Sequence, residues 1–324
     1  MTKLLFLCCF VLFGRICWAT SFDQYNPDKT GKTDVSGPLD MALKDAAGSD
    51  KRLVISPGRY LVASPVILPG HVSIVAPDGG VQLNGTPEND IFQVRRNHGN
   101  CLEDISFSNC KRAIAAVGDG YFAVAYVRRC SFANCGAGVD ASPVQLVSFV
   151  DCSFSSCGYG IRGGKGYGGR SNGVYIYHTV FSRISDWAIE IEGSPTHIMD
   201  CDFEGCDGGG IALFDSMVST IEGCYFEGMS KERNNDILVG NRRLSTRLVI
   251  VRGNQFNGVH SQRRIIVTND NGAHIYDNFA YLKKGQILVD YAPENKNVRV
   301  ENNSIENEGD IPPQLPKDEK GKEK

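Results

Sequence analysis

Apolar and small residues recur along this chain at a nearly regular interval. The clearest mark of the repeat is a phenylalanine, at Phe107, Phe132, Phe154, Phe181, Phe203, Phe226 and Phe256. Five positions before these anchors stand further apolar residues, namely Leu102, Val127, Phe149, Ile176, Ile198, Ile221 and Val251. A repeat of about 22 to 30 residues, built from short apolar runs and turns, is typical of a stacked solenoid.

Within each repeat the apolar residues alternate with polar ones, which predicts strands rather than helices. Val147–Phe149 and Val174–Ile176 follow this period of two, and Gly, Asn, Asp and Ser separate the runs. One repeat fits three short strands and three turns, and stacked repeats lie about 4.8 Å apart. A β-propeller repeats at about 40 residues or more, and a β-sandwich has no fixed motif. We therefore predict an all-β fold, a right-handed single-stranded parallel β-helix over residues 20–307.

Stacking places like residues above one another, so the repeat also predicts the interior. Position −2 relative to the anchor holds Cys130, Cys152, Cys201 and Cys224, and then Asn254, Asn278 and Asn303. Stacked Asn side chains can hydrogen-bond along the solenoid axis. Inward Phe, Ile and Cys are expected to form internal columns.

The two ends of the chain differ from the repeat. Residues 1–19 read as a secretory signal, whose apolar stretch is too short to span a bilayer comfortably. An amphipathic pattern predicts a short helix near residues 37–47, with Ser36 as a possible N-cap, covering the open N-terminal end of the solenoid. Residues 20–36 are expected to run along the outside. Residues 308–324, rich in Pro and charge, are expected to be disordered.

Charge and cysteine content refine this picture. The formal net charge of −3 becomes −5 when the signal takes away Lys3 and Arg15, which argues weakly against a nucleic-acid partner. No other segment could span a membrane, so we expect a secreted or periplasmic protein.

Three of the twelve cysteines lie in the signal, leaving nine. Exported proteins often contain a disulfide framework. The internal column predicts instead that the cysteines act as small apolar packing residues, and we favour this second interpretation.

A family resemblance follows from the N-terminal segment. There the predicted helix precedes Leu53–Val62 and then Leu68-Pro69-Gly70, and this order resembles the pectate-lyase-3-like group of the pectin-lyase-like superfamily. The resemblance covers residues 36–307 and implies the β-helix fold. The superfamily includes lyases, hydrolases, epimerases and non-catalytic modules. The motifs N-T-D…D-D…G-H-G, R-x-P-x-x-R and D-P-H-D of its catalytic members are missing, so no catalytic residue carries over.

Stacking also places outward side chains side by side. His178 is expected one rung from both Asp151 and Asp200, with Tyr175 and Tyr177 beside it. A histidine flanked by carboxylates suits general acid–base catalysis, and exposed aromatic rings grip sugars. The predicted catalytic residues are His178, Tyr177, Asp151 and Asp200. The predicted substrate-binding residues are Tyr126, Arg128, Arg129, Lys165, Tyr167, Arg170, Tyr175 and His197. Alternatively, these residues form an ordinary solvated strand face.

A second patch contains Asp202, Glu204 and Glu227, with the two glutamates stacked in one column. Like charges in that arrangement repel one another, and a bound Ca²⁺ would relieve them. A shared proton, or a pair of carboxylates set for glycoside cleavage, would relieve them too. A solvated acidic face is the simpler alternative. No cofactor is required by this interpretation, and Ca²⁺ is a possible one.

The predicted function is that of an exported carbohydrate-active protein acting on an acidic polysaccharide in a surface groove. In the lyase or epimerase hypothesis, His178 or Tyr177 removes the C5 proton, and Asp151 and Asp200 orient His178. Arg128, Arg129 or Arg170 pairs with the sugar acid. Hydrolysis by Asp200 with Asp202 or Glu204 is the nearest variant. A non-catalytic glycan-binding or structural module, or a surface protein that contacts other proteins, remains the alternative.

Overall fold

The computed structural model describes most of the repeat region. The described residues are 19–95, 97–118, 120–141, 143–164, 171–193, 195–229, 235–240, 248–258, 264–268, 272–292, 295 and 297–307. The predictions of a signal in residues 1–19 and of disorder in residues 308–324 therefore fall outside this part, apart from Ala19.

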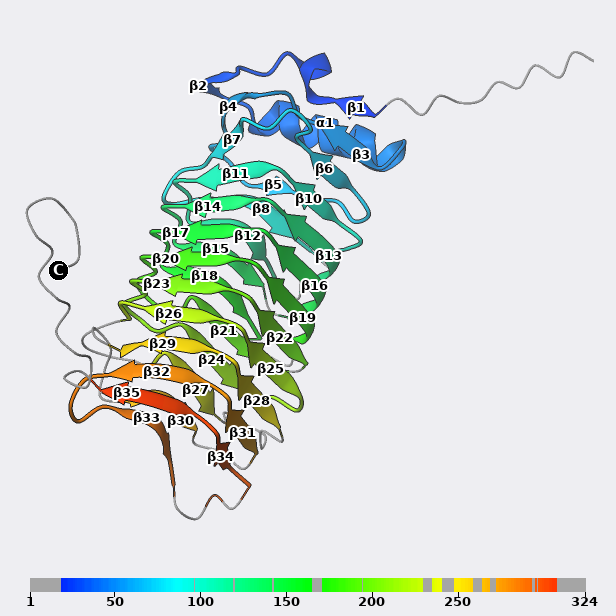
Figure 1. Ribbon diagram of the computed structural model, residues 1–324. Helices are drawn as coiled ribbons and strands as arrows, with labels where there is room; N and C mark the ends of the chain where they lie inside the picture. Colours follow the sequence, from blue (N-terminus) through cyan, green and yellow to red (C-terminus); the bar gives the residue numbers. More distant parts are fainter. Residues whose placement is uncertain are drawn as a thin grey trace, which may run out of the picture.

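The chain winds into a parallel β-solenoid with three long sheets, as predicted (Figure 1). Sheet A contains, in spatial order, β1 (Thr20–Ser21), β3 (Arg52–Val54), β6 (Ser73–Val75), β10 (Cys101–Glu103), β13 (Phe122–Arg128), β16 (Val144–Val150), β19 (Asn172–Tyr177), β22 (Thr196–Met199), β25 (Ser219–Glu222), β28 (Val249–Arg252), β31 (Ala273–Tyr276) and β34 (Arg299–Glu301), with β9 (Asn97–His98) beside β13. Successive strands of this sheet pair in parallel, so each residue lies directly above its counterpart one rung later.

The other two sheets follow the same order along the axis. Sheet B contains β2 (Thr30–Asp34), β4 (Gly58–Leu61), β7 (Val81–Asn84), β11 (Ile105–Ser108), β14 (Ser131–Ala133), β17 (Ser153–Ser155), β20 (Val180–Ser182), β23 (Asp202–Glu204), β26 (Tyr225–Glu227), β29 (Gln255–Asn257), β32 (Phe279–Leu282) and β35 (Ser304–Asn307). Sheet C contains β5 (Val66–Ile67), β8 (Asp90–Val94), β12 (Arg112–Ala116), β15 (Ala137–Ala141), β18 (Tyr159–Gly163), β21 (Ile189–Glu192), β24 (Ile211–Phe214), β27 (Ile237–Gly240), β30 (Arg264–Thr268) and β33 (Ile287–Tyr291).

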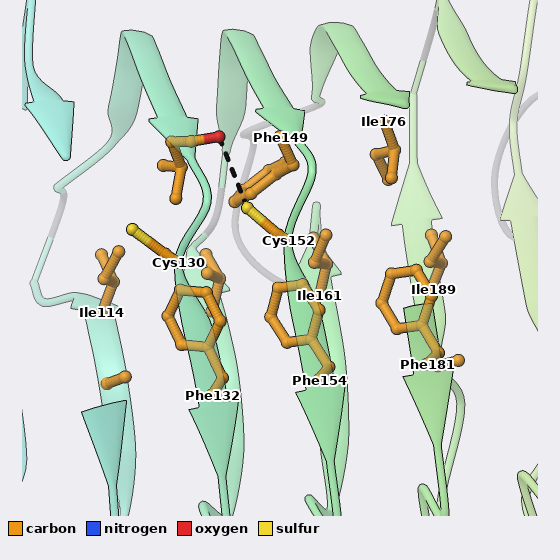
Figure 2. Packing of buried hydrophobic residues seen from close by; sticks show 14 of the residues in the cluster. Ile114, Cys130, Phe132, Phe149, Cys152, Phe154, Ile161, Ile176, Phe181 and Ile189 are labelled. Carbon is orange, nitrogen blue, oxygen red and sulfur yellow. Dashed lines mark hydrogen bonds between the residues drawn. The ribbon is translucent and has the colours of Figure 1, made fainter. Parts of the chain in front are cut away.

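The anchor phenylalanines stack in the interior, as the repeat predicts. Successive rings from Phe107 to Phe256 lie 4.5–5.1 Å apart between centroids and are nearly parallel. Figure 2 shows part of this column beside Cys130 and Cys152. All seven anchors are fully buried. The column therefore fixes the register of the rungs, because a slip by one residue would turn each ring outward.

The column at position −2 changes chemistry along the axis without changing its bonding partner. Cys152 donates from Sγ to the carbonyl of Val127 one rung earlier, at 3.5 Å (Figure 2). Asn278 donates from Nδ2 to the carbonyl of Val251, at 3.0 Å. Asn278 also donates to Asn303 Oδ1 at 2.9 Å, which confirms the predicted asparagine ladder. All nine cysteines of the described chain are free, and eight are buried, so the packing interpretation holds.

The N-terminal helix α1 (Ser36–Gly48) lies across the first rungs and packs against β3 and β5 (Figure 1). The helix fully buries its own side chains Leu39, Leu43 and Ala46, which confirms the predicted capping helix. The prediction that Ser36 is the N-cap is wrong. Ser36 is the first helical residue, and its backbone N–H donates to Asp34 Oδ1 at 2.9 Å. The Asp34 carboxylate thus accepts from a backbone N–H at the start of the helix that has no partner within the helix.

Residues 20–36 do not simply run along the outside, contrary to the prediction. Thr20–Ser21 and Thr30–Asp34 pair with β3 and β4 as an incomplete first rung, joined by the 3₁₀ helix η1 (Phe22–Tyr25). Phe22 is fully buried against Tyr60, with ring centroids 5.3 Å apart. The hydrophobic gain from burying this large ring offsets the conformational entropy lost in ordering an otherwise polar segment.

No helix in the described residues is long and apolar enough to cross a bilayer.

Candidate functional site

The candidate site lies along the corner where sheet A turns into sheet B. In nine successive rungs the corner residue has a positive φ, between +48° and +67°. These residues are Asp104, Arg129, Asp151, His178, Asp200, Gly223, Gly253, Asp277 and Asn302. Gly, Asn and Asp occupy such left-handed positions at least cost, and His is also enriched there. The corner thus explains the recurrent Asp, Asn and Gly by backbone conformation, which the sequence interpretation missed.

His178 stands between the two predicted carboxylates. Its Nδ1 lies 3.6 Å from Asp151 Oδ1, and its Nε2 lies 3.7 Å from Asp200 Oδ2. The three side chains are well exposed, with 62% of the His178 side chain open to solvent. These separations exceed hydrogen-bond length, so neither carboxylate holds the imidazole by a hydrogen bond. The structure thus places the three predicted residues next to one another on the exposed surface, at distances suited to electrostatic attraction.

Aromatic rings lie beside this triplet on the outward face of sheet A. Tyr175 stacks on His197, with centroids 5.4 Å apart and planes within 7°. The Tyr175 and Tyr177 centroids lie 6.4 Å apart. Burial, and to a lesser degree the neighbouring Tyr175, raises the pKa of Tyr177. A phenol with a raised pKa stays protonated, so Tyr177 is better suited to donate a proton than to remove one.

The two predicted arginines have different surroundings. Arg129 donates twice to Asp104, at 2.6 and 2.7 Å, and once to Glu103 at 2.7 Å. The hydrogen bonds from Arg129 also hold the pKa of Asp104 below its ordinary value. Among the described residues, the contacts of the Arg128 guanidinium with carboxylates are long, at 3.4 Å to Glu103 and 3.9 Å to Asp151. Arg128 is therefore the freer cation, whereas Arg129 is engaged in the surface structure.

Of the remaining predicted binding residues, the structure describes Tyr126 but does not describe the other three. Tyr126 lies on the same face of sheet A and is 39% exposed, two strands away from Tyr175. Lys165, Tyr167 and Arg170 lie outside the described residues. Their role in substrate binding stays a prediction.

The acidic patch on sheet B is arranged as the repeat predicts, with Glu204 directly above Glu227. Glu227 accepts hydrogen bonds from Tyr225 at 2.8 Å and from Asn257 at 3.2 Å. In the described part of the chain, no three His, Cys, Asp or Glu side chains converge as metal ligands. Hydrogen bonds to Glu227 thus relieve part of the predicted repulsion with Glu204, and Ca²⁺ binding with Asp202 stays a prediction.

Sheet C carries a ladder of ion pairs on its outward face. Arg112 bridges Asp90 at 2.7 Å and Asp140 at 3.4 Å, and Arg162 donates to Asp140 at 2.9 Å. The Arg162 guanidinium also lies 4.5 Å from the ring centroid of Tyr159. These charged side chains pair with one another, so we assign them a structural role.

Comparisons with known proteins identify the fold. The family model described as "Right handed beta helix region" matches residues 171–311. The chain folds as a right-handed parallel β-helix. This β-helix resembles the tailspike protein of Acinetobacter phage vB_ApiP_P1 at 17% identity and a TM-score of 0.69, over 90% of this chain and 59% of the tailspike. It thus spans about three fifths of that protein.

Two further solved structures share the fold. The A-module of mannuronan C-5 epimerase AlgE6 from Azotobacter vinelandii matches at 11% identity and a TM-score of 0.52, over 91% of this β-helix and 100% of the module. The surface protein and adhesin PfbA of Streptococcus pneumoniae matches at 10% identity and a TM-score of 0.50, over 89% and 97%. No curated protein matches the sequence. At such identities the likeness concerns the fold alone.

Proposed function

We propose that this β-helix is exported and acts on an acidic polysaccharide at the outward face of sheet A, by β-elimination or C5 epimerisation. The observation that carries the proposal is the exposed His178 between Asp151 and Asp200, beside the ring of Tyr175. A titratable base, flanking carboxylates and a ring surface for sugars occur together there. The fold likeness to a mannuronan C-5 epimerase supports this class of substrate.

The chemistry assigns each side chain a task. The neutral His178 imidazole takes the C5 proton, while Arg128 pairs with the sugar carboxylate and stabilises the charge that develops beside C5. In elimination the electron pair forms a C4–C5 double bond, the C4–O bond breaks, and Tyr177 gives a proton to the leaving oxygen. In epimerisation the C4–O bond stays intact, and Tyr177 returns a proton to C5 from the opposite side.

A non-catalytic glycan-binding module is the second candidate. It is favoured by the separations of 3.6 and 3.7 Å around His178, which leave the imidazole without a hydrogen-bonded orienting group. The fold likeness to a surface adhesin supports it as well. In this case the aromatic rings retain the glycan and His178 has no chemical role.

The reaction class can be tested on a panel of acidic polysaccharides in D₂O. Elimination produces ultraviolet absorbance from the new double bond, epimerisation exchanges deuterium into C5 without chain cleavage, and hydrolysis releases reducing ends without either signal. We expect His178→Asn to lower the rate about 100-fold or more. Asn is chosen because it accepts the left-handed backbone of this corner.

The matched control is His274→Asn, which changes another outward histidine of sheet A four strands further along the axis. Its rate should equal that of the unmodified protein. Full activity in His178→Asn would refute the assigned base. Binding without conversion of any substrate would favour the glycan-binding module.

A further inference from the structure

Two outward side chains of β16, Ser148 and Val150, are shorter than their neighbours on the strands on either side. In register, Ser148 lies between Tyr126 of β13 and Tyr175 of β19. One step further along the strand, Val150 lies between Arg128 and Tyr177. A row of short side chains is thus bordered by two rows of long ones.

The spacing between these rows suits a flat ring. Neighbouring strands lie about 4.8 Å apart, so the two tyrosine positions are separated by roughly 10 Å. Carbon atoms in contact need about 3.5–4.0 Å on each side, which leaves room for one pyranose ring above Ser148. His197 covers the far face of Tyr175, with nearly parallel planes, so the face toward Ser148 is the one left for a ligand. In the described part of the chain no aromatic ring packs against Tyr126.

We propose that β16 carries two adjacent sugar subsites and that the polysaccharide runs along this strand, across the solenoid axis. The first subsite holds a ring over Ser148, between Tyr126 and Tyr175. The second holds the next ring over Val150, between Arg128 and Tyr177, where His178 follows on the same rung. The step from Ser148 to Val150 is about 6.6 Å, comparable to one sugar unit. This inference rests on the proposed function and adds subsites and direction to it.

Charge distinguishes the two subsites. Arg128 is 40% exposed along its side chain and makes only long contacts to Glu103 and Asp151, so it can turn to a carboxylate on the second ring. The first subsite is lined by hydroxyl groups and ring faces, without a cation among its three named residues. The second subsite therefore selects a uronic acid, while the first accepts a neutral or acidic sugar.

Backbone strain marks the start of the same row. Val124 and Leu146 have φ values of +49° and +51°, and they are 54% and 55% exposed. Both interrupt the run of paired residues between β13 and β16, which resumes in the same register at Ala125 and Val147. A β-branched residue in the left-handed region is a conformational outlier, and such backbone strain clusters at functional sites. Here the residues that follow are those lining the first subsite.

Filling the row tests the proposal. Ser148→Tyr completes the aromatic column, and we expect it to weaken binding of oligogalacturonate and oligomannuronate tetramers at least tenfold in calorimetric titration. The matched control is Thr220→Tyr, which adds the same ring at the equivalent position of β25. Its affinity should stay within twofold of the unmodified protein. Tyr126→Leu removes the opposite ring, should weaken binding by a similar factor, and decides the question if Ser148→Tyr does not fold.

Arg128→Gln tests the second subsite. We expect this variant to lose affinity for the uronate tetramer and to keep its affinity for the same tetramer with reduced carboxyl groups. Unchanged binding in both Ser148→Tyr and Tyr126→Leu, together with an inactive His178→Asn, would overturn the subsites and leave the proposed function standing. An unmodified protein that neither binds nor converts any acidic glycan would refute both.

Discussion

The backbone of His178 limits which side chains can occupy its position. Its φ of +48° lies in the left-handed region, where Asp, Asn, His and Gly are tolerated and β-branched residues clash with their own carbonyl group. Asp151 and Asp200 share this conformation. The same corner that supplies turn residues to the solenoid thereby supplies carboxylates and a histidine to the candidate site. Turn formation and chemistry draw on one small set of residue types here.

This constraint predicts a difference between two valine substitutions. His178→Val should lower the free energy of unfolding by about 1 kcal/mol, because Val must adopt the left-handed conformation. His197→Val should not lower it, since His197 lies in extended β22, where Val is favourable. Urea denaturation of the two variants measures both values. Equal losses would show that the corner conformation does not constrain the residue.

The strands of sheet C are linked by charge as well as by backbone hydrogen bonds. Asp90 is 4% exposed and accepts two hydrogen bonds from Arg112 of the next rung. Burial by itself would raise the pKa of Asp90, but the hydrogen bonds from Arg112 and Gln93 outweigh it and hold the pKa below its ordinary value. A carboxylate with a lowered pKa stabilises the fold only while it is ionised.

The pH dependence of stability follows from that direction. The contribution of Asp90 is fully present above its unfolded pKa of about 3.9 and is lost as the pH falls through its lower folded value. Asp90→Asn should cost about 3 kcal/mol at pH 7, and this deficit should shrink as the pH falls below about 4. Thermal unfolding across this range measures it. The exposed Asp78→Asn is the control and should show no such trend; a constant deficit for Asp90→Asn would contradict the linkage.

The solenoid as a whole depends on protection of its N-terminal end. Helix α1 places Leu43 against the first rungs with no exposed surface, while Met41 on the same helix is 52% exposed. Leu43→Asp should produce aggregated protein or a strongly lowered melting temperature, because a buried unpaired carboxylate is costly and uncaps the strand edge. Met41→Asp should remain monomeric and within about 0.5 kcal/mol of the unmodified stability. Size-exclusion chromatography distinguishes the two, and equal behaviour would remove the capping role.

The repeat made the whole-molecule arrangement predictable, and its limits follow from the same cause. Stacked phenylalanines fix the register, so the proximity of His178 to Asp151 and Asp200 could be inferred from spacing alone. The separations beyond hydrogen-bond length depend on rotamers, which spacing does not specify. The engagement of Arg129 by Asp104 was missed for that reason too. Residues 20–36 carry no repeat, so the only apolar signal for their pairing with β3 and β4 was the isolated Phe22, Tyr25 and Val35.

The asparagine ladder has a direction. The Oδ1 of Asn278 accepts from both the backbone N–H and the Nδ2 of Asn254, and the Oδ1 of Asn303 does the same for Asn278. The Oδ1 of each asparagine therefore accepts from donors of the rung made before it, and each Nδ2 of Asn254 and Asn278 also donates to a carbonyl of the preceding rung. During synthesis, a nascent chain would carry its unsatisfied amides only at the newest turn. The order in which translation delivers the rungs is the order in which their buried polar groups become paired.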